Sequence, residues 1–238
     1  MNAVNHMSYR HPLQALLTGK AQPLEPRSEL SAIGKHPVSG RIWLGPLGLE
    51  GDERGDLVRH GGLEKALHHY PREHYAYWET LLNCRLATLE LGAFGENLST
   101  LGLDESNVSV GDTWSFGKAV VQISQGRQPC WRLNVRFGQL QMARWVQQSG
   151  RTGWYYRVVE PGFVSPEDEL QLLYRPHPGW TIRRLLRVLY EQRLSYGDLE
   201  ALLAIRELAP SWRALARRRL ETRTVEDFEA RLSTPPRR

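Results

Sequence analysis

Cysteine is scarce in this chain, and long apolar runs are missing from it. The 238 residues include only two cysteines, Cys84 and Cys130, which form neither a CxxC pair nor a zinc-ligand spacing. A disulfide framework is therefore not expected, which favours a reduced, cytoplasmic protein. No apolar run approaches the roughly 18–20 residues of a membrane span, and residues 1–14 lack the apolar core of a signal peptide. We expect no membrane partner.

The motifs of several large enzyme classes are also absent. The sequence contains no P-loop, no GxGxxG after a strand, no GxSxG nucleophile elbow and no HExxH zinc motif. Any chemistry must therefore rest on other residues. An apolar fraction of 41%, with 8 Trp and 9 Tyr, is ample for a packed core, so the chain is not expected to be disordered.

The net charge of +5 lies entirely in the C-terminal part of the chain. Residues 179–238 contain 13 Lys and Arg against 8 Asp and Glu, whereas residues 1–178 contain 18 of each sign. A basic tail can contact nucleic acid or another acidic partner. A solvated helix surface is the more common reason for such a charge, so nucleic acid is not expected as a partner.

Short extended segments broken by Gly and Pro predict a mainly β domain. Strands are expected near residues 40–44, 107–110, 114–116, 119–124, 153–159 and 170–174, with turns at Gly–Asp and Gly–Lys pairs. Few helices separate them. One is expected after Pro71, and a second is expected to place Phe137, Leu140, Ala143 and Val146 on one face and to end at Gly150. This pattern favours an antiparallel barrel over βαβ winding.

The Pro-His-Pro-Gly segment at residues 176–179 is the best candidate domain boundary. Beyond it the apolar period becomes helical, and Thr181, Asp198 and Ser211 can each begin a helix. We therefore predict a β-barrel domain over residues 1–175 and a small three-helix domain over residues 176–238.

The stretch at residues 125–134 contains a potentially reactive side chain, the thiol of Cys130. It places Cys130 after a proline and between Arg127 and Arg132. A free thiol has a pKa of about 8.5, and nearby guanidinium groups favour the thiolate, which attacks electrophiles or binds metals. The alternative is a small buried apolar residue. The flanking charges argue against burial in an apolar core, which leaves the two roles about equally supported by this stretch.

Polar residues elsewhere could complete a pocket around this thiol. His60 precedes two glycines, which let a ligand approach the backbone, and Lys65 adds charge suited to a phosphate. For His60 and His69, a hydrogen-bonded structural histidine is an equally supported alternative. For Asn97, a residue of a loop turn is the favoured interpretation. Asp52 and Asp56 could bind a hard metal ion, although a solvated turn is the favoured interpretation. Spacing alone does not show whether any of these residues converge on Cys130.

Short motifs are spread over nearly the whole chain. They are LGLEGD (47–52), RHGG (59–62), KAL (65–67), HYPREHY (69–75), FGENLS (94–99), ESNV (105–108), GD (111–112) and RQPC (127–130), and the tail adds RRL at 218–220 followed by EDF at 226–228. Together these motifs resemble those of the MOSC family, the molybdenum cofactor sulfurase C-terminal domain, and they match its YiiM-like branch best.

The resemblance implies a MOSC β-barrel followed by a three-helix domain, and a molybdenum–pterin cofactor held by the Cys130 thiolate. It makes His60, Asn97 and Arg127 pocket residues, with Lys65 and His69 as further candidates. The residues after the family cysteine vary, so Arg132 receives no role. Pyridoxal phosphate binding is a further family-level expectation.

Family members look like reductases of N-hydroxylated compounds such as 6-hydroxylaminopurine, which gives resistance to these mutagens by detoxification. We expect a small N-hydroxylated substrate, a separate flavoprotein as electron donor, and protons from His60 or His69; a homodimer is compatible with the sequence. The alternative is a non-catalytic carrier of molybdenum cofactor or sulfur that uses Cys130.

Overall fold

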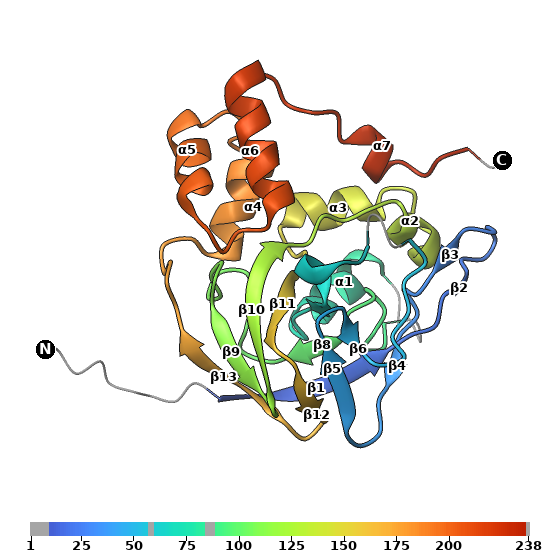
Figure 1. Cartoon of the computed structure of the whole chain (residues 1–238). Helices are drawn as coiled ribbons and strands as arrows, with labels where there is room; N and C mark the ends of the chain where they lie inside the picture. The colour runs from blue at the N-terminus through green and yellow to red at the C-terminus, as the bar shows by residue number, and fades with distance from the viewer. Residues whose placement is uncertain (1–9, 57–59, 84–88, 237–238) are drawn as a thin grey trace, which may run out of the picture.

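A closed ring of strands forms the body of the protein in the computed structural model, which describes residues 10–56, 60–83 and 89–236 (Figure 1). The ring order is β13-β9-β10-β11-β7-β8-β1, and a β13–β1 pairing closes it. All its pairings are antiparallel except β7–β8. The predicted β-barrel is confirmed. Its strands are β1 (Arg10–Thr18), β7 (Leu67–His69), β8 (Leu98–Thr100), β9 (Thr113–Phe116), β10 (Ala119–Gly126), β11 (Trp154–Glu160) and β13 (Glu169–Tyr174).

Alternating side chains fill the barrel. Along β10, Ala119, Val121 and Ile123 are buried while the residues between them are partly exposed, as expected for a strand with one inward face. They pack with large inward residues of neighbouring strands, among them Trp114 and Tyr156. Closure of the ring leaves no long unpaired edge.

Smaller strands surround the barrel. β4 (His36–Pro37) extends the sheet beside β1, and β5 (Ile42–Gly45) pairs with both β6 (Gly48–Leu49) and β12 (Gly162–Val164). The hairpin of β2 (Gln22–Pro23) and β3 (Leu30–Ser31) forms a separate two-stranded sheet. The segment just after β3 forms one wall of the pocket described below.

Two helices follow β10, where the sequence pattern predicted one. α2 (Arg132–Phe137) ends at Gly138, which adopts a left-handed conformation with φ of 61°, and α3 (Met142–Ser149) begins after a break. Leu140, placed on the predicted apolar face, is 82% exposed. The prediction was wrong here because a glycine C-cap interrupts the apolar spacing. The predicted helix end at Gly150 is confirmed.

A second apolar cluster packs these helices against α1 (His74–Leu81). Tyr75 and Trp78 of α1 meet Phe94, Leu133 and Val146. The short 3-10 turn η1 (Leu63–Lys65) directly precedes β7 in the chain. The loop between β10 and α2 thus connects a strand of the barrel's core to a helix of the second cluster.

The C-terminal helices are α4 (Ile182–Tyr190), α5 (Tyr196–Ala204), α6 (Pro210–Thr222) and α7 (Glu229–Leu232). The predicted N-cap is confirmed at Thr181, whose hydroxyl accepts from the Arg184 amide at 3.2 Å. The next helix starts earlier than predicted, with Ser195 rather than Asp198 before its first turn. α6 begins at Pro210, because proline at the first helical position needs no donor partner.

The helices share the barrel's core. Leu186 of α4 and Trp212 of α6 lie so close to Gly126 of β10 that a Cβ there would meet each at 3.2 Å. Glycine therefore allows close packing at this contact. The domain boundary at residues 175 and 176 stays a prediction. In the described part of the chain, no helix has the length and apolar character needed to cross a membrane.

Candidate active site around Cys130

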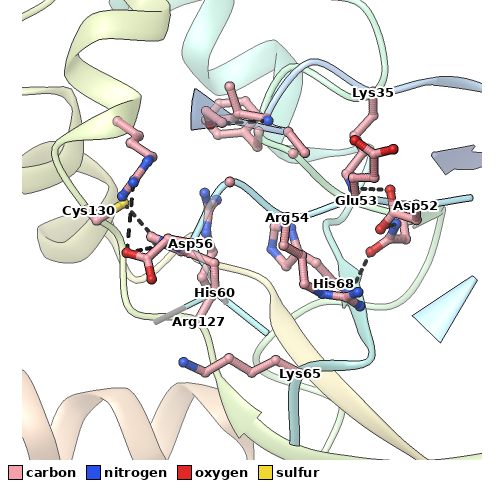
Figure 2. Close-up of a pocket in the computed structure, with 18 of the residues that line it drawn as sticks. Lys35, Asp52, Glu53, Arg54, Asp56, His60, Lys65, His68, Arg127 and Cys130 are labelled. Atoms are coloured by element: carbon pink, nitrogen blue, oxygen red, sulfur yellow. Dashed lines mark hydrogen bonds and ion pairs between the residues drawn. The ribbon is translucent and has the colours of Figure 1, made fainter. Parts of the chain in front are cut away.

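One pocket brings together most of the residues that the sequence singled out. It encloses about 620 Å³, including the space at its open mouth, between the loop after β10 and the segments at residues 31–35, 52–56 and 60–65. His60, Lys65, Asn97, Arg127 and Cys130 all line it, and Figure 2 labels all of these except Asn97. The convergence that spacing could not show is therefore present.

Cys130 lies in the loop between β10 and α2. The strand runs to Gly126, two residues beyond its predicted end, and Trp131 precedes the first turn of α2. The thiol is partly exposed, and its sulfur lies 3.4 Å from Nε2 of His60. Cys84, the other cysteine, lies outside the described residues, as does Arg59 of the RHGG motif.

His60 is neutral at neutral pH. Burial and, to a lesser extent, the positive charges of Arg132, Lys65 and Arg127 together lower the pKa of its imidazole to about 4, against the effect of Asp56. Its Nδ1 lies 3.9 Å from an Asp56 carboxylate oxygen. The neutral ring can therefore accept a proton at one nitrogen or share its own proton with the neighbouring sulfur.

Arg132 was left without a role by the sequence, yet it lines the pocket. Its guanidinium lies 3.8 Å from the Asp56 oxygen that faces His60, and its side chain is only 12% exposed. Arg132 therefore does not face solvent. Asp56, expected in a solvated turn, instead joins Arg132 to His60. No cluster of metal-binding side chains occurs in the residues described.

Arg127 supplies a donor deep in the pocket. Arg127 is 7% exposed, and its Nη1 has no hydrogen-bond partner among the described residues. Its backbone amide bonds to the carbonyl of Gly153 at 3.0 Å, which fixes the start of the loop on β11. Lys65 adds a second positive charge, although burial lowers the pKa of its ammonium group. A buried donor of this kind is suited to an anionic ligand.

Asn97 braces the pocket wall. Its amide nitrogen donates to Asp52 at 3.0 Å and to the Leu17 carbonyl at 3.1 Å, and its amide oxygen accepts from the His68 backbone at 3.1 Å. Both amide hydrogens are thus engaged within the protein. The geometry gives Asn97 a structural task beside any contact with a ligand.

An ion pair that the sequence did not indicate lies behind Asn97. The ammonium group of Lys35 contacts Asp52, and both side chains are almost fully buried. The solvated turn predicted for Asp52 is therefore wrong. Burial lowers the pKa of Lys35, against the attraction of Asp52. This pair ties the segment after β3 to the loop before His60.

His69 does not line the pocket. It is fully buried inside the barrel, where its ring nitrogens lie 3.1 Å from the Tyr156 hydroxyl and 2.9 Å from the Thr100 hydroxyl. The preceding residue, His68, is the one at the pocket, because successive side chains of β7 point to opposite faces. His69 thus has the position of a hydrogen-bonded core histidine.

Burial of His69 predicts a pH-dependent stability. Burial lowers the pKa of His69 to about 3 in the folded protein, whereas in the unfolded chain its pKa is about 6.5. Between pH 3 and pH 6.5 the unfolded chain therefore binds more protons than the folded protein. Stability contributed by the neutral ring is present above pH 6.5 and is lost as pH falls toward 3, by roughly 3 kcal/mol at pH 4. Urea unfolding of wild type and His69→Gln at pH 7 and pH 4 measures this. The free energy of unfolding is expected to fall less in the variant than in wild type between pH 7 and pH 4. An equal fall in both proteins would contradict the buried, neutral state of His69.

Comparison with known proteins defines the class first. The MOSC domain model matches residues 56–171, and the model of the YiiM-like 3-alpha helix domain matches residues 180–223. Protein YiiM of Escherichia coli (strain K12) is 41% identical over 224 residues, which cover 94% of this chain and 98% of that protein. The crystal structure of YiiM from Escherichia coli superposes with a TM-score of 0.81 at 35% identity, covering 94% of this chain and 99% of that one.

These matches and the barrel show a MOSC-domain protein. Within that class, the chain belongs to the YiiM-like family, with its C-terminal helical domain. The MOSC family is associated with binding of the molybdenum cofactor. A protein named "Reductase" from Gibberella moniliformis (strain M3125 / FGSC 7600) is 34% identical over 170 residues, which cover 71% of this chain and 30% of that longer protein.

Proposed function

We propose that the protein holds a molybdenum cofactor through Cys130 and reduces N-hydroxylated compounds, 6-hydroxylaminopurine among them. The observation that carries this proposal is a partly exposed thiol in a pocket with a buried, unsatisfied arginine donor. A thiolate is a soft ligand suited to a polarisable metal. Such a reductase would detoxify mutagenic base analogues.

The residues present fit the cofactor. A phosphate-bearing pterin is anionic and needs charged donors, and Nη1 of Arg127 lacks a partner among the described residues. Buried donors almost always form hydrogen bonds, and a buried donor without one costs free energy. A ligand oxygen that accepted from Arg127 Nη1 would remove this cost. Lys65 lines the same pocket and adds positive charge. Cys130, Arg127 and Lys65 would hold the group.

The reaction consumes two electrons and two protons: R–NHOH + 2 e⁻ + 2 H⁺ gives R–NH2 + H2O, with cleavage of the N–O bond. The cofactor supplies the two-electron chemistry when bound, and a separate flavoprotein reductase would renew its electrons. The protein's own residues position the substrate and handle protons. Neutral His60, with Nε2 beside the Cys130 sulfur, is placed to pass a proton at this nitrogen, and Asp56 lies on its far side. His69 is enclosed in the barrel and is not placed for this task.

Metal content and turnover, measured on the same preparation, test the proposal against the carrier alternative. Stoichiometric molybdenum with reduction of 6-hydroxylaminopurine by a supplied electron donor is expected. Metal-free protein that accumulates a persulfide on Cys130, with no turnover, would instead support a sulfur carrier. Molybdenum-loaded protein that transfers its cofactor to another enzyme without reducing the substrate would support a cofactor carrier.

A further inference from the structure

The last described segment of the chain folds back over the cysteine loop. After α6 the chain crosses to α7, which lies over α2 and α3 (Figure 1). Leu232 of α7 is buried in the cluster that contains Leu133 and Val146. This segment lies beyond residue 223, where the match to the three-helix domain model ends.

Arg231 of α7 brackets Cys130. Its guanidinium donates a hydrogen bond to the carbonyl of Pro129, the residue before the cysteine, from 102 positions away in the sequence. Its own carbonyl accepts from the amide of Trp131, the residue after the cysteine, at 2.8 Å. One residue therefore holds the backbone on both sides of the thiol.

The second guanidinium nitrogen ties Arg231 to α3. Nη2 of Arg231 donates to the side-chain oxygen of Gln147 at 2.6 Å. The guanidinium also lies 5.7 Å from the ring centroid of Tyr190 and 5.6 Å from that of Phe228. A planar group with several donors can make these contacts together, whereas a lysine ammonium cannot reproduce their geometry.

Residues next to Arg231 support the same loop. The Asn134 side chain donates to the Leu232 carbonyl at 2.8 Å and to the Thr234 hydroxyl at 3.2 Å. The Arg27 guanidinium lies 5.2 Å from the Trp131 ring centroid and donates to the Pro235 carbonyl at 3.0 Å. The tail therefore joins the loop to the β2–β3 hairpin, next to the wall of the pocket.

We infer that Arg231 is a positioning residue for Cys130, holding the thiol in the pocket beside His60. The reason is mechanical. The loop between β10 and α2 has no regular structure, and its first residue is fixed on β11 through the Arg127 amide, so its middle depends on Arg231. Displacing a reacting group by about 1 Å can cost about 10²-fold in rate. The effect on turnover rests on the proposed function; the order of the loop does not.

The test compares Arg231→Ala and Arg231→Lys with wild type in the full-length protein. Backbone amide exchange of residues 128–134 is expected to accelerate by about tenfold in the alanine variant and less in the lysine variant. Exchange within β9 and β10 stays unchanged. On cofactor-loaded protein, kcat for 6-hydroxylaminopurine is expected to fall by about 10²-fold with little change in KM, with partial recovery in the lysine variant.

Arg144→Ala is the matched control. Arg144 of α3 forms an ion pair at 2.7 Å with Glu229, which lies on α7 like Arg231 but has an exposed side chain. In the contacts described, Arg144 touches no atom of the loop. Its removal is expected to change neither the exchange nor kcat. If the alanine variant fails to fold, the lysine variant, which keeps the charge and the aliphatic stem, provides the exchange comparison.

The outcomes separate this inference from the proposed function. Exchange at residues 128–134 that stays at the wild-type rate in both Arg231 variants overturns the inference, whatever the activity. Faster exchange in a protein that shows no turnover in any form supports the inference and contradicts the reductase. Equal acceleration in Arg144→Ala would mean that α7 acts as a whole, which would also overturn a specific role of Arg231.

Discussion

Replacing Cys130 with alanine is expected to abolish molybdenum retention and reduction while leaving the fold intact. In the described lining of the pocket, Cys130 supplies the sulfur, and its loss removes the soft ligand of the proposed site. Metal retention is expected to fall by more than about 10²-fold, because even partners in the outer shell of a metal site contribute about 10–100-fold. Metal analysis and the reduction assay on purified variants measure both effects.

The fold is expected to survive because Cys130 is partly exposed and packs in neither apolar cluster. Circular dichroism and the urea midpoint check this. Cys84→Ala is the control: Cys84 is predicted to be dispensable, so metal content and turnover should stay at wild-type values. Turnover that persists in Cys130→Ala would show that the thiolate assignment is wrong.

The positions of several strands and the start of the helical region could be predicted because they depend on local patterns. Alternation along β10 and the cap at Thr181 are both encoded within a few residues. The break at Gly138 was missed because apolar spacing continues across it. The neighbours His68 and His69 show the limit of this approach, because only the register of β7 decides which of them reaches the pocket.

The remaining site residues could not be predicted, because their contacts are remote in sequence. Lys35 and Asp52 are 17 positions apart, and the bond from Arg231 to Pro129 spans 102. Neither pair shares an element with a recognisable period. Motif resemblance placed His60, Lys65 and Arg127 in one pocket, but it gave no reason to include Arg132, whose task depends on Asp56.

Lys35→Met is expected to destabilise the fold strongly. The Lys35 and Asp52 side chains are 6% and 2% exposed. Removing the ammonium group leaves the Asp52 carboxylate buried, with the Gly19 amide at 2.8 Å and the Asn97 side-chain amide at 3.0 Å as its remaining donors among the described residues. Breaking a buried pair from one side costs about 3–5 kcal/mol, because the other charge stays out of water without its counter-ion. Urea unfolding at neutral pH measures the loss.

The neighbouring pair of Lys20 and Glu53 provides the matched control. Its N–O distance is 2.9 Å, but its side chains are 62% and 47% exposed, so Lys20→Met is expected to cost less than about 1 kcal/mol. The double variant Lys35→Met/Asp52→Asn removes the buried charge as well. It is expected to recover part of the loss, since a neutral amide accepts from one donor but turns its NH2 toward the other. If Lys35→Met and Lys20→Met lose equal stability, burial does not govern the inner pair, and the pocket wall behind Asn97 is held by its hydrogen bonds alone.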